Sequence, residues 1–263
     1  MLGPNKWTIR FLNTSLTRRN VTHVWLLVAA ACTMTAASVR ADDPPPKSEA
    51  AKKNSVHWAD EQSQGMPLVF SDDFQQGSQR WQTTDDTAWT LSRDGENQVF
   101  GLNRRISNYQ PKFRSPHNIA LIKDIKVSSF VLIFRVKSTN DTGNHRDCCV
   151  FFGYQSPTKF YYVHLGAKPD PASGQIMIVD EAARRPLTEN QKTVAWDDKW
   201  HTVKVVRDSQ EGSIEVYFDN MKSPHMTIVD KTFTNGQIGL GSFDDMNDFD
   251  DVRLYGMQSS ETK

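Results

Sequence analysis

Aromatic and imidazole side chains alternate along the apolar segment 160–165. In an extended strand Phe160, Tyr162 and His164 point to the same face. An aromatic ring can pack on the apolar face of a sugar ring, while imidazole and phenol groups hydrogen-bond its hydroxyls. These three residues are therefore our first candidates for ligand binding. The alternative is that His164 is a strand histidine satisfied by its neighbours.

Polar residues in two further segments are candidates for the rim of such a site. Arg114 and His117 lie in a stretch with the pattern of a loop, and loops often carry positioned binding groups. Arg146, between His145 and Asp147, comes just before a predicted strand that would bring this group to the mouth of the same face. The alternative for all of them is an ordinary solvated surface.

The acidic residues do not form the pattern expected of a retaining glucanase. Such an enzyme places its nucleophile and acid about 5 Å apart, which a Glu-x-Asp-x-Glu run on one strand achieves through alternation. The sequence has no such run. It therefore argues against this class of hydrolase, and it leaves any catalytic residues unknown because other acid pairs could converge in space.

Short segments rich in Val, Ile, Phe, Tyr and Trp, each bounded by Gly, Pro, Asn or Asp, recur between residues 66 and 257. This pattern is typical of β-sandwiches and barrels, and no segment has a 3.6-residue apolar stripe. It predicts an all-β domain of two stacked antiparallel sheets. We expect strands near 68–74, 89–92, 98–102, 120–122, 130–136, 149–154, 160–165, 176–179, 202–207, 213–218, 226–229, 237–242 and 249–255.

One predicted hairpin specifies its two faces. If Tyr154 pairs with Lys159 across a loop that contains Pro157, Val150 lies on an apolar face that should be core. The opposite face then carries aromatic rings with polar tips, among them Tyr162. The sequence therefore favours this second face as the ligand-binding one.

The first residues have the pattern of an export signal. A basic region is followed by the apolar run 24–31 and by small residues up to Ala41, which predicts a signal peptide over 1–41. The run is shorter than the ~20 residues of a membrane span, so we expect no span and a location in the periplasm, on the cell surface or outside the cell. A weak twin-arginine pattern at Arg18-Arg19 and a lipoprotein anchored through Cys32 are the minority alternatives.

Removal of this signal peptide changes the charge and leaves two cysteines. The chain has 31 basic and 31 acidic residues. Five basic residues and no acidic one precede the cleavage point, so 26 basic and 31 acidic residues remain, a net charge of −5. Without a basic stripe, nucleic acid is not expected as a partner. The adjacent Cys148 and Cys149 form neither a disulfide framework nor a zinc-ligand spacing, so zinc is not predicted.

The flanks of the folded part are expected to be irregular. Residues 42–65 are rich in Pro, Lys, Ser and Ala and lack apolar periodicity, which predicts a disordered linker. The folded domain is expected over 66–257, and 258–263 is expected to be a C-terminal tail.

Four segments in a fixed order resemble a known family. They are 68–74 (LVFSDDF), 198–205 (DKWHTVKV), 236–241 (GQIGLG) and 249–252 (FDDV). This order resembles the concanavalin A-like lectin and glucanase domains of exported bacterial proteins, including the laminin G-like and 3-keto-disaccharide hydrolase-like groups, and it covers 66–257. The resemblance implies a jelly-roll sandwich whose concave face receives a saccharide, often with a calcium ion near the chain ends.

Acidic residues gather in two segments, 72–73 and 244–251, that the resemblance makes neighbouring strands. Carboxylates are the hard oxygen ligands that Ca²⁺ prefers. Asp73, Asp245 and Asp250 are the candidate ligands, and a solvated acidic surface is the alternative. No other cofactor is expected.

Our leading hypothesis is a secreted, monomeric glycan-recognising module that binds a saccharide or glycan polymer on the concave face. The second is a carbohydrate-active hydrolase of the 3-keto-disaccharide hydrolase-like type, which would release products. The third is a structural or adhesion domain, whose concave face would be filled by its own loops. Fold analogy alone does not choose among them.

Overall fold

The computed structural model describes residues 59–258. The predicted signal peptide with Cys32, the linker up to residue 58 and the tail from residue 259 lie outside the described residues. Among the described residues, no helix is long and apolar enough to cross a membrane.

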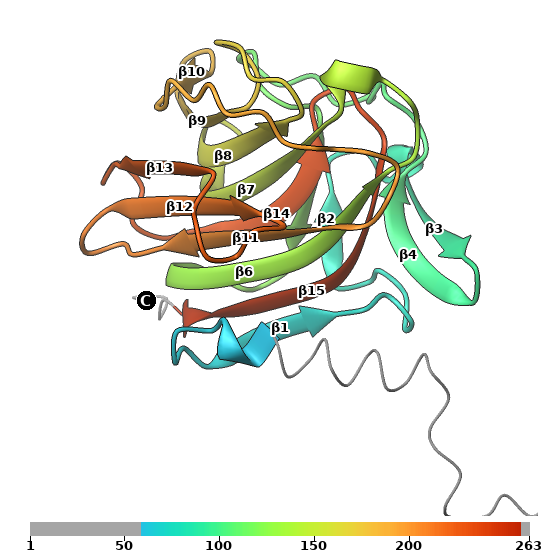
Figure 1. The fold of residues 1–263 in the computed structure, drawn as a ribbon, viewed down its shortest axis with the longest axis horizontal. Coiled ribbons are helices and arrows are strands. Elements are labelled where there is room, and N and C mark those ends of the chain that lie inside the picture. Colours follow the sequence, from blue (N-terminus) through green and yellow to red (C-terminus); the bar gives the residue numbers. More distant parts are fainter. Residues whose placement is uncertain (1–58, 259–263) are drawn as a thin grey trace, which may run out of the picture. The chain divides into compact units, whose positions relative to one another are not determined.

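The described residues form two antiparallel sheets stacked face to face, as the sequence predicted (Figure 1). The larger sheet has eight strands, with β6 and β15 at its centre. Their order is β13 (Met226–Val229), β12 (Ser213–Phe218), β11 (His201–Arg207), β6 (Val127–Ser138), β15 (Asn247–Gln258), β4 (Asn97–Leu102) and β3 (Trp89–Asp94), and β1 (Leu68–Asp72) pairs with β15.

The second sheet has seven strands and carries the segment in which we placed the first binding candidates. Two of its strands, β2 and β10, are too short for a periodic sequence pattern and were not expected. The order is β10 (Arg185–Pro186), β9 (Gln175–Asp180), β8 (Lys159–Gly166), β7 (Asp147–Ser156), β14 (Gln237–Ser242), β5 (Asn118–Ile122) and β2 (Trp81–Thr83).

The main core lies between the two sheets and is built from alternate residues of the facing strands. Phe130 and Phe134 of β6 meet residues such as Phe152 and Tyr161 of β7 and β8. Each fully buried side chain of this kind contributes roughly 1.5–3 kcal/mol to folding. Because both described cysteines are free thiols, packing rather than a cross-link stabilises the sandwich.

The hairpin of β7 and β8 confirms the predicted assignment of its two faces. Phe152 pairs with Tyr161 and Val150 pairs with Val163, and these residues belong to the inter-sheet core. The turn itself is tighter than expected, because Ser156 rather than Tyr154 is the partner of Lys159. A register shift between Phe152 and Ser156 absorbs the difference.

Residues 59–62, which the sequence assigned to the linker, pack on the eight-stranded sheet. Ala59 lies in a short helical turn and is buried against the outer face of the eight-stranded sheet. Asp60 accepts a hydrogen bond from the Tyr255 hydroxyl at 2.6 Å, and Gln62 accepts one from Lys204 at 3.1 Å. These contacts cover apolar residues of β6, β11 and β15 that the strands alone would leave exposed.

Candidate functional site

The outer face of the seven-stranded sheet, which faces away from the eight-stranded sheet, is not an open aromatic surface. Phe160 and Tyr162 point to this face as predicted, but both are 0% exposed. With Phe151, Met177 and Val179 they form a second apolar cluster. This corrects the expectation that Phe160 and Tyr162 contact a ligand directly. A face so rich in apolar groups is stable only when it is removed from water.

Two irregular segments, 103–117 and 181–184, meet beside this face. The backbone N–H of Arg184 donates to the carbonyl of Arg114 at 3.0 Å, which joins the two segments. Tyr109, in the first segment, is close enough to act with burial in raising the pKa of Tyr154 on β7. Covering of this face by the chain's own loops is the feature that we expected of an adhesion domain.

One part of the face stays open, at the end where β7 begins and β8 ends. A pocket of about 260 Å³ lies there, and we call it the His164 pocket. It is lined by groups of both charges and by one aromatic ring. The residues used below are Arg105, Arg114, Asp147, His164, Arg184, Phe243, Asp244 and Asp245.

His164 is held in this pocket by a turn that follows β8. Its Nδ1 lies 2.9 Å from the carbonyl oxygen of Ala172. The turn is fixed by Asp170, whose Oδ1 accepts hydrogen bonds from the N–H groups of Ala172 and Ser173. Gly174 closes it with φ +68°, and a Cβ there would lie 2.6 Å from Pro169. His164 thus lines the pocket, with its Nε2 buried, and its role in ligand binding stays a prediction.

Arg184 forms one wall of the His164 pocket. Its guanidinium lies 4.3 Å from the ring centre of Phe243, and its NH1 donates to the Tyr162 hydroxyl at 3.1 Å. The His164 ring stacks on Phe243 at 5.9 Å, with an interplanar angle of 13°. Tyr162 thus supports the pocket from behind instead of contacting its contents.

Two buried carboxylates, Asp147 and Asp245, also line the pocket. Asp245 Oδ2 accepts hydrogen bonds from the backbone N–H of Asp147 at 3.1 Å and from Thr142 Oγ1 at 3.0 Å. Its Oδ1 is buried without a hydrogen-bond partner. Burial, followed by the charge of Asp147, raises the pKa of Asp245. An unpaired buried carboxylate oxygen is a strong acceptor for a hydroxyl group that enters the pocket.

The remaining candidates for the rim lie in different places. Arg114 lines the pocket, with its guanidinium 5.4 Å from the Phe243 ring centre. His117 packs edge-on against the same ring at 5.3 Å and does not line the pocket. Arg146 is turned away, because it forms an ion pair with Asp141 at 2.9 Å and donates to the Trp196 carbonyl at 3.2 Å. Arg146 is therefore a structural residue here.

The three acids proposed for calcium have three different surroundings. Asp245 belongs to the His164 pocket. Asp250 is buried in the eight-stranded sheet, where its Oδ2 accepts a hydrogen bond from Asn97 at 2.8 Å. Asp73 lines a separate pocket of about 220 Å³ near β1 and β15. Across residues 59–258 these three acids do not form one cluster of ligand atoms, which corrects the grouping.

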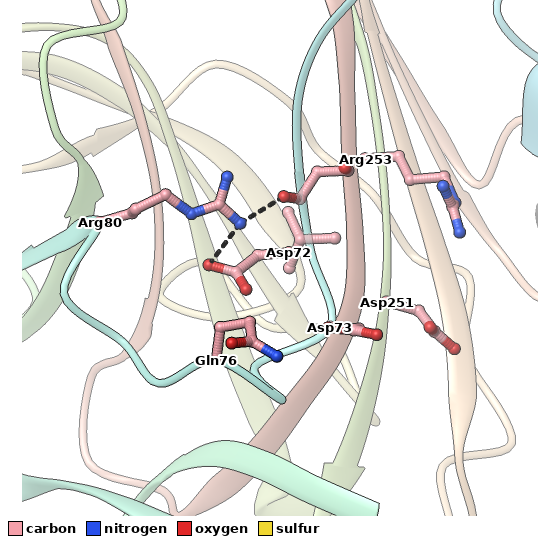
Figure 2. Close-up of a pocket in the computed structure, with 8 residues that line it drawn as sticks. Asp72, Asp73, Gln76, Arg80, Asp251 and Arg253 are labelled. Atoms are coloured by element: carbon pink, nitrogen blue, oxygen red, sulfur yellow. Dashed lines mark hydrogen bonds and ion pairs between the residues drawn. The ribbon is translucent and has the colours of Figure 1, made fainter.

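Figure 2 shows the pocket that contains Asp73. Arg80 bridges the Asp72 carboxylate, at 3.2 Å, and the carbonyl of Ser71, so Asp72 is already paired. Asp251 on the other side pairs with Arg135 at 3.4 Å. These basic partners neutralise the carboxylates that would attract a cation. Calcium stays a prediction from the sequence.

Sequence reasoning missed Arg105, Arg184 and Phe243. They lie in irregular segments that come together only through the fold, and no periodic pattern marks them. The arginine pair 184–185 after a strand is the one local signal for Arg184. Asp147 and Asp245 were noted as acids, but their approach to one another follows from the pairing of β7 with β14.

The fold is that of the concanavalin A-like lectin sandwiches. Winged bean acidic lectin, solved with methyl-α-D-galactose, is 13% identical, with a TM-score of 0.51 over 73% of this chain and 98% of the lectin. No family model matches the sequence, and no curated protein matches it. The narrower resemblance to laminin G-like and 3-keto-disaccharide hydrolase-like groups therefore stays an expectation.

Two further solved structures are similar at lower TM-scores. The carbohydrate-binding module CBM66 from Bacillus subtilis is 17% identical, with a TM-score of 0.48 over 67% of this chain and 96% of that one. Domain 4 of an arabinanase from Geobacillus stearothermophilus, solved with arabinotriose, is 10% identical, with a TM-score of 0.49 over 74% of this chain and 95% of that one.

Proposed function

We propose that this protein is a glycan-recognising β-sandwich module and that the saccharide binds in the His164 pocket. The pocket is open at one end of the sheet and is small enough to take one or two sugar units. Its walls combine arginine donors, carboxylate acceptors and an aromatic edge, which are the groups that orient hydroxylated ligands in pockets. The lectin fold supports the same class of ligand.

The observation that carries the proposal is the unpaired Oδ1 of Asp245. Buried polar atoms are normally hydrogen-bonded, and leaving one without a partner costs roughly 1–3 kcal/mol. Asp245 is 1% exposed, and its position is fixed by two other hydrogen bonds. A sugar hydroxyl that donates to Oδ1 would give this oxygen its missing hydrogen bond. Arg184 would donate to a second oxygen of the same sugar.

We further propose that the module acts outside the cytoplasm as a monomer. The N-terminal pattern of basic, apolar and small residues supports export. The free thiols of Cys148 and Cys149 are both buried, so the described part of the chain needs no disulfide chemistry in an oxidising compartment. Size-exclusion chromatography with light scattering tests the oligomeric state.

The test is a glycan array with the full chain, followed by calorimetric titration of each glycan that binds. Asp245→Asn keeps the side-chain volume but replaces one acceptor oxygen with a donor group. We expect it to weaken binding at least about tenfold, which corresponds to about 1.4 kcal/mol. Arg185→Ala is the matched control for Arg184→Ala, because Arg185 is exposed and lies outside the pocket.

Binding that survives both Asp245→Asn and Arg184→Ala in folded protein would place the saccharide elsewhere. Absence of binding on a broad array would remove the proposal and favour the adhesion alternative, for which the covered outer face is the supporting observation.

A second candidate function is glycoside hydrolysis. The observation that favours it is the raised pKa of Asp245, caused by burial and by the charge of Asp147. A carboxyl group with a raised pKa holds its proton to higher pH than an ordinary aspartate does, which is the property that a general acid needs. Product release by the wild-type protein, abolished by Asp245→Asn, would establish it. Binding without product release would support the module.

A further inference from the structure

Three side chains, two of which line the His164 pocket, bring together the donor types of a transition-metal site. A carboxylate oxygen of Asp147, Sγ of Cys149 and a ring nitrogen of His164 all lie within 4.8 Å of one another. The three residues are 5%, 0% and 4% exposed, respectively. Among residues 59–258 this is the one such group of three.

The pairing of β7 with β8 produces this arrangement. Asp147 and Cys149 are two residues apart on β7 and therefore point to the same face. His164 on β8 is the direct cross-strand partner of Cys149, and directly opposed residues have Cβ atoms about 4.5–5.5 Å apart. The site therefore rests on two central strands instead of a loop. The adjacent Cys148 points the other way, into the inter-sheet core.

The hydrogen bond at Nδ1 decides what Nε2 of His164 can do. A carbonyl oxygen only accepts, so Nδ1, 2.9 Å from Ala172 O, carries the hydrogen and donates it. Arg184 NH1, 3.2 Å from the same nitrogen, can then donate only to the Tyr162 hydroxyl. Nε2 of the neutral ring is left with its lone pair. A backbone carbonyl on the second nitrogen is the usual support of a metal-binding histidine.

Nε2 has no hydrogen-bond partner and is buried. Oδ2 of Asp147 lies 3.3 Å from it. A lone pair and a carboxylate oxygen this close in a buried place repel each other unless a positive charge lies between them. That charge is either a proton on Nε2 or a metal ion.

We propose that Asp147, Cys149 and His164 bind a divalent metal ion of borderline softness, Zn²⁺ in the first place. One sulfur, one nitrogen and one oxygen ligand match zinc, whereas Ca²⁺ and Mg²⁺ require oxygen ligands. Asp147 and His164 also line the pocket, so a fourth position would face its interior. Binding of the ion does not depend on the saccharide proposal, and either can fail without the other.

The first experiment titrates the full chain with Co²⁺ as a spectroscopic substitute for Zn²⁺. We expect saturation at one equivalent, a thiolate-to-cobalt charge-transfer band in the near ultraviolet, and loss of the band when Zn²⁺ is added. Cys149→Ser should remove the band, and His164→Ala should weaken zinc binding by at least about 100-fold, since even outer partners of metal ligands cost 10–100-fold. Cys148→Ser is the matched control and should keep the band.

A second measurement needs no variant and stays decisive if Cys149→Ser fails to fold. X-ray absorption of the zinc-loaded wild-type protein should show one sulfur at about 2.3 Å and nitrogen or oxygen ligands at about 2.0–2.2 Å. A zinc coordination shell without sulfur would overturn the proposal. So would folded wild-type protein that binds no Co²⁺ or Zn²⁺ at one equivalent, or a charge-transfer band that persists in Cys149→Ser.

Discussion

The guanidinium of Arg184 lies 4.3 Å from the centre of the Phe243 ring. This contact joins the segment before β10 to the segment after β14, which are 59 positions apart in the chain. Because Arg184 also donates to Tyr162, it connects the open pocket to the buried aromatic cluster behind it.

Replacement of Arg184 by lysine tests this role. Lysine keeps the charge but loses the planar stacking on Phe243 and the geometry of the bond to Tyr162. We expect saccharide affinity to fall about tenfold, or about 1.4 kcal/mol, measured by calorimetric titration. Arg185→Lys, on an exposed neighbouring position, should bind as the wild type does. Equal affinity of all three proteins would exclude Arg184 from the binding site.

Phe160→Ala should affect stability far more than ligand contact. Phe160 is fully buried among Phe151, Tyr154 and Tyr162, and such a truncation leaves a cavity. We expect the free energy of unfolding to fall by about 3–5 kcal/mol, measured by urea denaturation. Leu91→Ala is the control, because Leu91 is 38% exposed. Its loss of unfolding free energy should be well below that of Phe160→Ala.

A Phe160→Ala protein that is nearly as stable as the wild type but no longer binds saccharide would contradict the buried position. It would restore the open aromatic face that the sequence predicted.

The buried carboxyl of Asp250 should make stability depend on pH. Burial, followed by the charge of Asp251, raises its pKa from 3.8 to about 6. The folded state then holds the proton of Asp250 more tightly than the unfolded chain does. This difference adds to the free energy of unfolding below pH 4, and the added stability is lost as the pH rises to about 6. Relative to Asp250→Asn, the free energy of unfolding of the wild type should fall by about 1–3 kcal/mol across that pH range.

Unfolding free energies of the wild type and Asp250→Asn at several pH values between about 4 and 7 measure this difference. Asparagine keeps an oxygen that can accept from Asn97, so the two proteins are comparable. A difference that is independent of pH, or that grows in favour of the wild type as pH rises, would show that the Asp250 pKa is not raised.

Calcium binding is tested through thermal stability. A ligand that binds only the folded state raises the melting temperature according to its concentration and affinity. If the sequence prediction holds, Ca²⁺ raises the melting temperature more than Mg²⁺ does, and Asp73→Asn reduces the shift. No shift at millimolar Ca²⁺ would remove calcium as a cofactor. The comparison with Asp73→Asn is independent of the zinc titration, because Asp73 lies in a different pocket.

The local pattern of the sequence was sufficient for the longer strands and for the faces of the central hairpin, but not for the short strands β2 and β10. Alternation sends Val150 and Phe152 to one side of β7 and Phe151 to the other. Nothing local indicated that segments 103–117 and 181–184 would meet beside the second face. The aromatic residues there were therefore taken for a ligand surface when they are a second core.

The sequence by itself determined the fold class, the core residues of the long strands and the position of His164 on the outer face, because these depend on a two-residue period. Only the tertiary structure decided that Asp147, Cys149, His164, Arg184 and Asp245 converge. Their proximity depends on the pairing of β7 with β8 and β14 and on loops without periodicity. Long-range contacts of this kind carry chemistry but leave no repeating pattern in the chain.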